Sequence, residues 1–163
     1  MIDYDLKKNF VDEKVLKDIN FHLTSNMFGW FVQPKITDNT IELYNFCLSH
    51  TFFEDNKINS DYFIIIKPLI DKIKMSKLIR LKANLYPRTD RIIEHGKHID
   101  YNVEGKTALF YVNNNDGFTN LNDEIKIKSI ANNLVTFDNL VLHNSSTCTN
   151  EKYRLAIVIN YKE

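Results

Sequence analysis

A series of short segments from Lys77 onward most restricts the folds open to this chain of 163 residues. Most of them carry apolar side chains at every second position, which is the spacing of a half-buried β-strand. The expected strands are residues 78–86, 98–101, 106–113, 125–128, 134–137, 139–143 and 153–161. Asn, Asp, Ser and Gly residues at 114–117, 132–133 and 144–146 predict turns between them. The pattern predicts a mostly β fold with flanking helices, either a double-stranded β-helix (jelly roll) or a sandwich.

The first 76 residues are expected to form a mixed, partly helical lead-in. Val11, Val15, Leu16 and Ile19 have helical spacing. We expect a short strand at 28–32, a helix at 39–50, and another helix at 68–75 that begins with Pro68 in its first turn. With four glycines, three prolines and no linker, we predict a single domain over residues 1–163, with the jelly-roll core at 77–163.

The motif His98-Ile99-Asp100 indicates a metal site. Alternate side chains of a strand share one face, so His98 and Asp100 can reach one ion. His143 follows Asp100 by 43 residues and would supply a second imidazole from another strand. Two imidazoles and one carboxylate, with coordination positions left open, form the facial triad of non-haem Fe(II) oxygenases.

Arg154 stands 11 residues after His143, at the start of the apolar run 155–159. A guanidinium that enters a core costs several kcal/mol unless it is paired. Its planar fork suits a carboxylate, and no acidic neighbour stands close in the sequence. A ligand carboxylate is one expected partner, and an Asp or Glu from another strand is the other.

Each of these residues has an alternative interpretation as part of an ordinary strand or turn. Residues 98–100 also suit a surface strand with its polar side chains in water, and His143 suits a hydrogen-bonded turn. His95 lies three residues before His98, so on a strand the two would point to opposite faces. We therefore expect His95 to face solvent near the mouth of the site.

The polar face of residues 78–86 also has two interpretations. Arg80, Lys82, Asn84 and Tyr86 alternate with apolar residues, as do Thr107, Leu109, Tyr111 and Asn113 in the strand 106–113. Such faces line a wet pocket or stand in bulk water. The pattern itself favours neither.

Charge and cysteine usage bear on partners and location. The 21 basic and 21 acidic residues balance, so no basic field favours a nucleic-acid partner. No apolar run approaches the roughly 18 residues of a membrane span, so no membrane partner is expected. The N-terminus lacks the apolar core of a secretory signal, and Cys47 and Cys148 match no metal-ligand spacing. We expect reduced thiols and a cytoplasmic protein, in the host cytoplasm if the source is a virus.

Taken together, these motifs resemble the Fe(II)/2-oxoglutarate-dependent dioxygenases. The similarity is greatest to the prolyl 4-hydroxylase-like branch, including its short stand-alone viral and microbial members. It extends over about residues 78–161 and rests on segments 80–87, 98–100, 107–113, 116–117, His143 and 153–157. The family often has a Gly-Gly pair after the Tyr-x-Asn strand, where this chain has Asp116-Gly117.

The resemblance implies a role for each matching residue. His98, Asp100 and His143 match the iron ligands, and Arg154 matches the residue that pairs with the distal carboxylate of 2-oxoglutarate. Tyr111 and Tyr86 match tyrosines of the cosubstrate pocket, and Thr119 is expected to project into it. The implied cofactors are Fe(II), the cosubstrates 2-oxoglutarate and O2, and ascorbate as reductant.

The implied reaction hydroxylates a substrate C–H bond and converts 2-oxoglutarate and O2 to succinate and CO2. A protein prolyl or other side chain is the expected substrate, and a small molecule is the alternative. Two other functions stay open, a zinc-dependent hydrolase that also uses His95 and a non-catalytic jelly-roll binding or assembly module. The hydrolase leaves Arg154 without a role, and the module predicts that a triad residue is missing.

Overall fold

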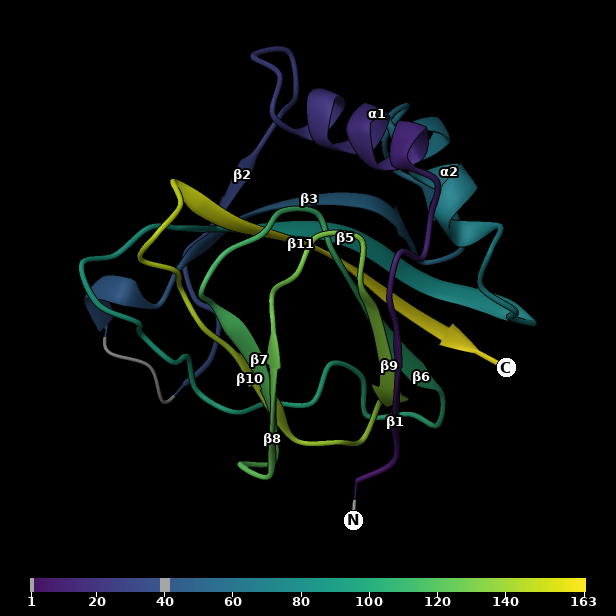
Figure 1. Ribbon diagram of the computed structural model, residues 1–163. Helices are drawn as coiled ribbons and strands as arrows, with labels where there is room; N and C mark the ends of the chain where they lie inside the picture. The colour runs from purple at the N-terminus through teal and green to yellow at the C-terminus, as the bar shows by residue number, and fades with distance from the viewer. Residues whose placement is uncertain (1, 39–41) are drawn as a thin grey trace.

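The computed structural model describes residues 2–38 and 42–163. Within these ranges the strands form two antiparallel sheets that face each other (Figure 1). The major sheet has the order β1 (Tyr4–Lys7), β9 (Leu134–Asp138), β6 (Lys106–Tyr111), β11 (Tyr153–Lys162), β5 (Lys77–Pro87), β3 (Cys47–Glu54) and β2 (Phe31–Gln33), and β4 (Lys57–Ile58) pairs with β3. The minor sheet has the order β10 (His143–Ser145), β7 (Phe118–Leu121) and β8 (Ile125–Lys128).

Alternation along the central strands of the major sheet separates two apolar clusters. Ala108 and Phe110 pack in one cluster with residues of the helices α1 (Glu13–Leu23) and α2 (Phe63–Ile70). Leu109 and Tyr111 pack in the other cluster with Leu121 and Ile127 of the minor sheet. The helices therefore cover one face of the major sheet and the minor sheet covers the other (Figure 1).

The prediction of a mostly β jelly roll with flanking helices is confirmed. Strands cover most of the predicted segments 78–86, 106–113, 125–128, 134–137 and 153–161. The sheets are larger than expected, because β1, β2 and β3 come from the first 76 residues and belong to the major sheet.

Three local predictions around the site are wrong. Residues 98–101 form no strand, since His98 makes only an isolated bridge with His143. Residues 139–142 form a turn in which the Val141 N–H donates to the Asp138 carbonyl at 3.0 Å. The predicted turn 144–146 instead contains most of β10, whose pairing with β7 buries polar side chains that sequence patterns assign to turns.

The predicted helices of the lead-in need correction as well. A helix at 39–50 is wrong for its described part, because only the 3₁₀ turn η1 (Glu42–Tyr44) is helical and Cys47 begins β3; residues 39–41 lie outside the described ranges. The helix expected at 68–75 runs instead from Phe63 to Ile70. Burial of Ile66, Leu69 and Ile70 fixes this position, so that Pro68 falls in the last turn. No helix within the described residues is both long and apolar enough to cross a membrane.

Candidate functional site

A cavity of about 180 Å³ lies between the two sheets. Its wall on β5 consists of Arg80, Lys82, Asn84 and Tyr86. Of the two interpretations of this polar face, the structure therefore supports the one in which it lines a pocket. Ala156 and Val158 of β11 form its apolar floor. The predicted metal ligands and Arg154 line the same cavity, so one space connects them.

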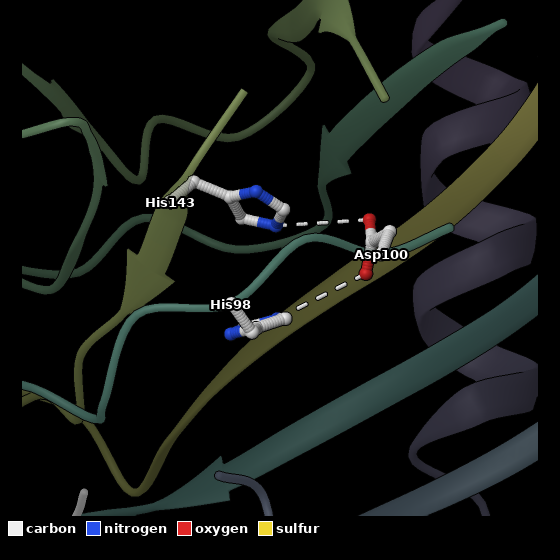
Figure 2. A group of neighbouring side chains, drawn as sticks. All are labelled: His98, Asp100 and His143. Carbon is white, nitrogen blue, oxygen red and sulfur yellow. Dashed lines mark ion pairs between the residues drawn. The ribbon is translucent and has the colours of Figure 1, made fainter. Parts of the chain in front are cut away.

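His98, Asp100 and His143 converge on one point of this cavity (Figure 2). One ligand atom from each residue lies within 4.8 Å of the other two. The Nε2 atoms of His98 and His143 lie 3.9 Å and 3.7 Å from the two Asp100 oxygens. Mutual backbone hydrogen bonds of 2.9 Å between the two histidines fix their spacing. Although the expected strand is absent, the bridge brings the three donors together.

The second nitrogen of each imidazole is bound to the backbone. The Nδ1 atom of His143 lies 2.9 Å from the Val141 carbonyl oxygen, and that of His98 lies 3.3 Å from the Gly96 carbonyl oxygen. Each carbonyl accepts a hydrogen bond from the Nδ1–H group, which leaves Nε2 of each ring as the acceptor. Both histidines therefore present their metal-binding nitrogen to Asp100.

Asp100 is oriented by polar side chains behind it. Its Oδ2 accepts hydrogen bonds of 3.3 Å from both the Thr107 hydroxyl and the Asn160 amide. Its Oδ1 forms an ion pair of 3.3 Å with Arg80. Burial opposes the charged form, but His143, Arg80 and His98 outweigh it and hold the pKa of Asp100 below its ordinary value. The carboxylate is thus ionised at neutral pH and ready to accept a cation.

Arg154 is the largest fully buried side chain of the described residues, with 1% of its surface exposed. Its Nη2 donates a hydrogen bond of 2.8 Å to the Thr119 hydroxyl, while its Nε has no partner among the described residues. The guanidinium carbon lies 5.2 Å from the Tyr86 ring centre and 5.6 Å from that of Tyr111. No ion pair joins Arg154 to an acidic side chain within the described ranges, so the Asp or Glu expected as one of its two partners is not found there.

The wall around Arg154 is built from residues expected in the cosubstrate pocket. The Tyr111 hydroxyl donates a hydrogen bond of 2.9 Å to the same Thr119 oxygen, and Tyr86 lines the cavity. Burial raises the pKa of both tyrosines, so both remain neutral phenols. A Cβ at Gly117 would stand 2.7 Å from Arg154 Cδ and 2.6 Å from the Thr147 carbonyl oxygen. The absence of a side chain at Gly117 therefore lets the start of β7 approach Arg154.

Solved structures that share this arrangement of sheets include several oxygenases. One is a viral collagen prolyl hydroxylase from Paramecium bursaria Chlorella virus-1, in complex with 2-oxoglutarate. The two structures superpose with a TM-score of 0.61 at 12% identity, and the aligned part covers 98% of this chain and 96% of the hydroxylase. A prolyl hydroxylase from Trichoplax adhaerens, in complex with a hypoxia-inducible-factor peptide, has a TM-score of 0.63 at 16% identity, with 98% and 83% covered. The chain has the fold of the Fe(II)/2-oxoglutarate oxygenases.

A solved structure with this fold is named for a different reaction, an epimerisation. The non-haem α-ketoglutarate-dependent epimerase SnoN from nogalamycin biosynthesis has a TM-score of 0.68 at 11% identity, with 99% of this chain and 79% of its own covered. No protein-family model matches the chain, and no curated protein sequence matches it. The likeness is thus one of fold, and the site itself must carry the argument for function.

His95 departs from its prediction, because it is buried in the oxygenase fold with 3% of its surface exposed. Its Nδ1 lies 2.8 Å from the Ser145 hydroxyl, its ring stacks on Tyr86 at 5.3 Å, and its Nε2 has no partner among the described residues. The backbone bonds that tie residues 95–98 to β10 turn the ring inward, where a regular strand would have placed it in solvent. Burial and the nearby Arg154 lower the pKa of His95 to about 4, so the ring is neutral.

Sequence reasoning missed Asn160 as a part of the site. It is fully buried, donates to Asp100, and donates a second hydrogen bond of 2.9 Å to Thr107. A signal was present, because Asn160 shares a strand face with Arg154, Ala156 and Val158 at the end of an otherwise apolar run.

Proposed function

We propose that this protein is an Fe(II)/2-oxoglutarate-dependent dioxygenase that hydroxylates a substrate C–H bond. The observation that carries the proposal is the shared cavity, in which three convergent metal donors lie near a buried, incompletely paired arginine. Either feature alone is compatible with a different function. Together they match a site in which one end of a dicarboxylate would chelate a metal ion and the other end would bind a cationic side chain.

The residues present fit ferrous iron. His98 and His143 offer imidazole nitrogens and Asp100 offers an ionised carboxylate, all directed to one side. A set of two imidazoles and one carboxylate with open positions is the donor set of non-haem Fe(II) oxygenases. His98, Asp100 and His143 would hold the ion, and Thr107 and Asn160 would orient the carboxylate.

The residues around Arg154 fit 2-oxoglutarate. His143 pairs with Leu121 and Ser145 pairs with Thr119, so Thr119 stands two residues, or about 7 Å, along β7 from the level of the metal ligand. This short step suits a five-carbon dicarboxylate. Arg154 would bind its distal carboxylate through Nε and Nη2, supported by Thr119, Tyr111 and Tyr86.

Iron, when bound, would supply the activation of O2 that couples decarboxylation of 2-oxoglutarate to succinate and CO2 with hydroxylation of the substrate. The protein's own residues position and shield the reactants. Arg154 orients the cosubstrate by holding its far end, which converts a diffusive encounter into a fixed geometry. Ala156, Val158 and Leu109 form an apolar floor that limits water beside the reacting carbon.

For the substrate, we propose a chemical class. The similarity to prolyl hydroxylases named for collagen and for a peptide complex supports a protein side chain, and SnoN supports a small molecule as the alternative. Ascorbate is proposed as the reductant and the cytoplasm as the location. We also propose one domain over residues 1–163, since β3 of the lead-in pairs directly with β5.

The zinc-dependent hydrolase has less support than the oxygenase. It would use His95, whose Nδ1 lies against Ser145, and the metal-binding group formed by the described residues contains only His98, Asp100 and His143. It also leaves the buried Arg154 without a role. A non-catalytic module has less support still, because all three triad residues are present and converge.

Product analysis tests the proposed activity. Purified protein is incubated in air with Fe(II), ascorbate and 2-oxoglutarate, and succinate is quantified against 2-oxoglutarate consumed. We expect slow, iron-dependent formation of one succinate per 2-oxoglutarate, abolished in Asp100→Ala. Absence of succinate from the folded, iron-loaded protein would contradict the proposal, and hydrolytic activity restored by Zn²⁺ would replace it.

A further inference from the structure

The cavity carries more positive charge than the metal and cosubstrate use. If the proposed function holds, the two charges of Fe(II) and that of Arg154 are balanced by Asp100 and the two carboxylates of 2-oxoglutarate. Arg80 and Lys82 then remain as two further cations in the same wall. Among the described residues that line the cavity, Asp100 is the only acid.

Arg80 is already engaged with groups of the protein. It donates to Asn160 at 3.0 Å, forms the ion pair with Asp100, and lies over the Tyr101 ring at 4.9 Å. Its charge is used in orienting the metal ligand. Arg80 therefore contributes positive potential to the cavity, but its contacts with the protein leave it little freedom to reorient toward a ligand.

Lys82 is the cation without a partner. It is half-buried, and no hydrogen bond or ion pair joins it to any residue in the described ranges. Burial and the nearby Arg80 lower the pKa of Lys82, while the carboxylates of Asp100 and Glu54 act in the opposite direction, and Asp100 is bound to Arg80. A partly buried ammonium without a counter-charge is costly, so a ligand that supplies one gains affinity.

The register places Lys82 between the two ends of the site. Lys82 pairs with Val158, while Arg80 pairs with Asn160 beside Asp100, and Tyr86 pairs with Arg154. On its other side Lys82 pairs with Thr51 of β3. The minor sheet that carries Thr119 packs on β6, β9 and β11, so β5 with Lys82 lies at the edge of its cover, where we place a second ligand.

We propose that Lys82 binds an anionic oxygen group of the substrate, most simply a carboxylate, next to the metal site. The group is either a free acid or an acidic side chain of a peptide. This inference rests on the proposed function, because the charge balance assumes iron and 2-oxoglutarate. It predicts a substrate that is acidic close to the carbon that is oxidised, in contrast to an uncharged prolyl segment.

The test uses the full chain loaded with Mn(II) in place of Fe(II) and saturated with 2-oxoglutarate. Carbon-13-labelled acetate is titrated in, and its relaxation by the paramagnetic ion is measured beside acetamide, which has the same shape without the charge. Wild type is compared with Lys82→Met, Lys82→Arg and Lys77→Met, the last at an exposed lysine of the same strand. Mn(II) and 2-oxoglutarate affinities are determined for every variant beforehand.

We expect saturable relaxation of acetate, but not of acetamide, in wild type, Lys82→Arg and Lys77→Met, with affinity reduced at least about tenfold in Lys82→Met. Equal behaviour of acetate and acetamide, no saturable binding in wild type, or unchanged binding in Lys82→Met would overturn the inference. Failure of Mn(II) or 2-oxoglutarate to bind would instead overturn the proposed function. Displacement of the labelled acetate is then compared for L-glutamate and for acetyl-Ala-Glu-Ala-amide. The stronger competitor shows whether the site prefers a free acid or an acidic peptide.

Discussion

The Arg154 guanidinium donates a hydrogen bond of 2.8 Å to the Thr119 hydroxyl across the space between the two sheets. Thr119 also accepts from Tyr111, so the hydroxyl connects β6 and β11 of the major sheet to β7 of the minor sheet. Arg154 is thereby fixed in position while its Nε stays unpaired among the described residues. A preorganised cation of this kind binds a carboxylate with little loss of side-chain entropy.

Replacement of Arg154 by Met should weaken 2-oxoglutarate binding. A hydrogen bond to a charged group contributes about 1.5–3 kcal/mol, so the affinity should fall about 10- to 100-fold. Calorimetric titration of the Mn(II)-loaded protein measures it, with Lys152→Met as the exposed control two residues away. Unchanged affinity in a folded Arg154→Met protein would remove Arg154 as the anchor.

Gly117→Ala should disturb the position of Arg154, because residue 117 lies against the Arg154 side chain. The new Cβ would meet backbone and side-chain atoms at 2.6–2.8 Å, so β7 or Arg154 must shift. We expect a loss of unfolding free energy of about 1–3 kcal/mol and weaker 2-oxoglutarate binding. Gly29→Ala is the matched control, because its nearest neighbours stand at 3.7 Å. Equal stability and affinity in the two variants would show that the close approach at Gly117 is unimportant.

Asn160→Leu should reduce metal affinity although Asn160 is no ligand. The change removes one of the two hydrogen bonds to Asp100 Oδ2 and the bond to Thr107. Loss of such a supporting contact typically lowers metal affinity about 10- to 100-fold. Calorimetry with Mn(II) measures the effect, and Lys162→Leu at the exposed end of β11 serves as the control. Wild-type metal affinity in Asn160→Leu would contradict the role given to this amide.

Stability of the metal-free protein should fall in mild acid because of His95. Its pKa lies near 6.5 in the unfolded chain and at about 4 in the fold, so between these values only the unfolded state gains the proton. Unfolding free energy is therefore retained above pH 6.5 and declines by about 3 kcal/mol as the pH approaches 4.

His95→Gln identifies the residue responsible for that decline. Glutamine does not titrate, so the variant should lose the part of the pH dependence that belongs to His95, while His98 and Asp100 contribute equally in both proteins. Urea unfolding at several pH values between 4 and 7 measures the difference. Parallel stability curves for the two proteins would show that His95 is not the group that titrates.

The strands of the site were predictable where one face is apolar and the other polar. Residues 106–113 show this contrast, and residues 153–161 contain a long apolar run. The two segments form the central strands β6 and β11. His98, Asp100 and His143 come together as their residue types and order predicted, although the strand expected to carry the first two is absent. The convergence of these side chains was thus easier to predict than the backbone structure that supports it.

Burial of polar residues is what local patterns failed to predict. β10 consists of His143, Asn144 and Ser145; the last two favour turns in isolation, and all three are buried here by pairing with β7. His95 is buried for a related reason, since bonds to β10 hold its segment inward. Such positions depend on contacts between residues 22 to 50 apart in the chain, and no window of neighbouring residues contains them.

An anaerobic titration of the metal-free protein with Fe(II) and then 2-oxoglutarate tests the central claim most directly. Chelation of Fe(II) by the keto acid produces a visible metal-to-ligand charge-transfer band, and no knowledge of the substrate is needed. We predict a band that appears only after both additions and is absent in His98→Ala. No band in the folded wild-type protein, or a band that persists unchanged in His98→Ala, would contradict the proposed site.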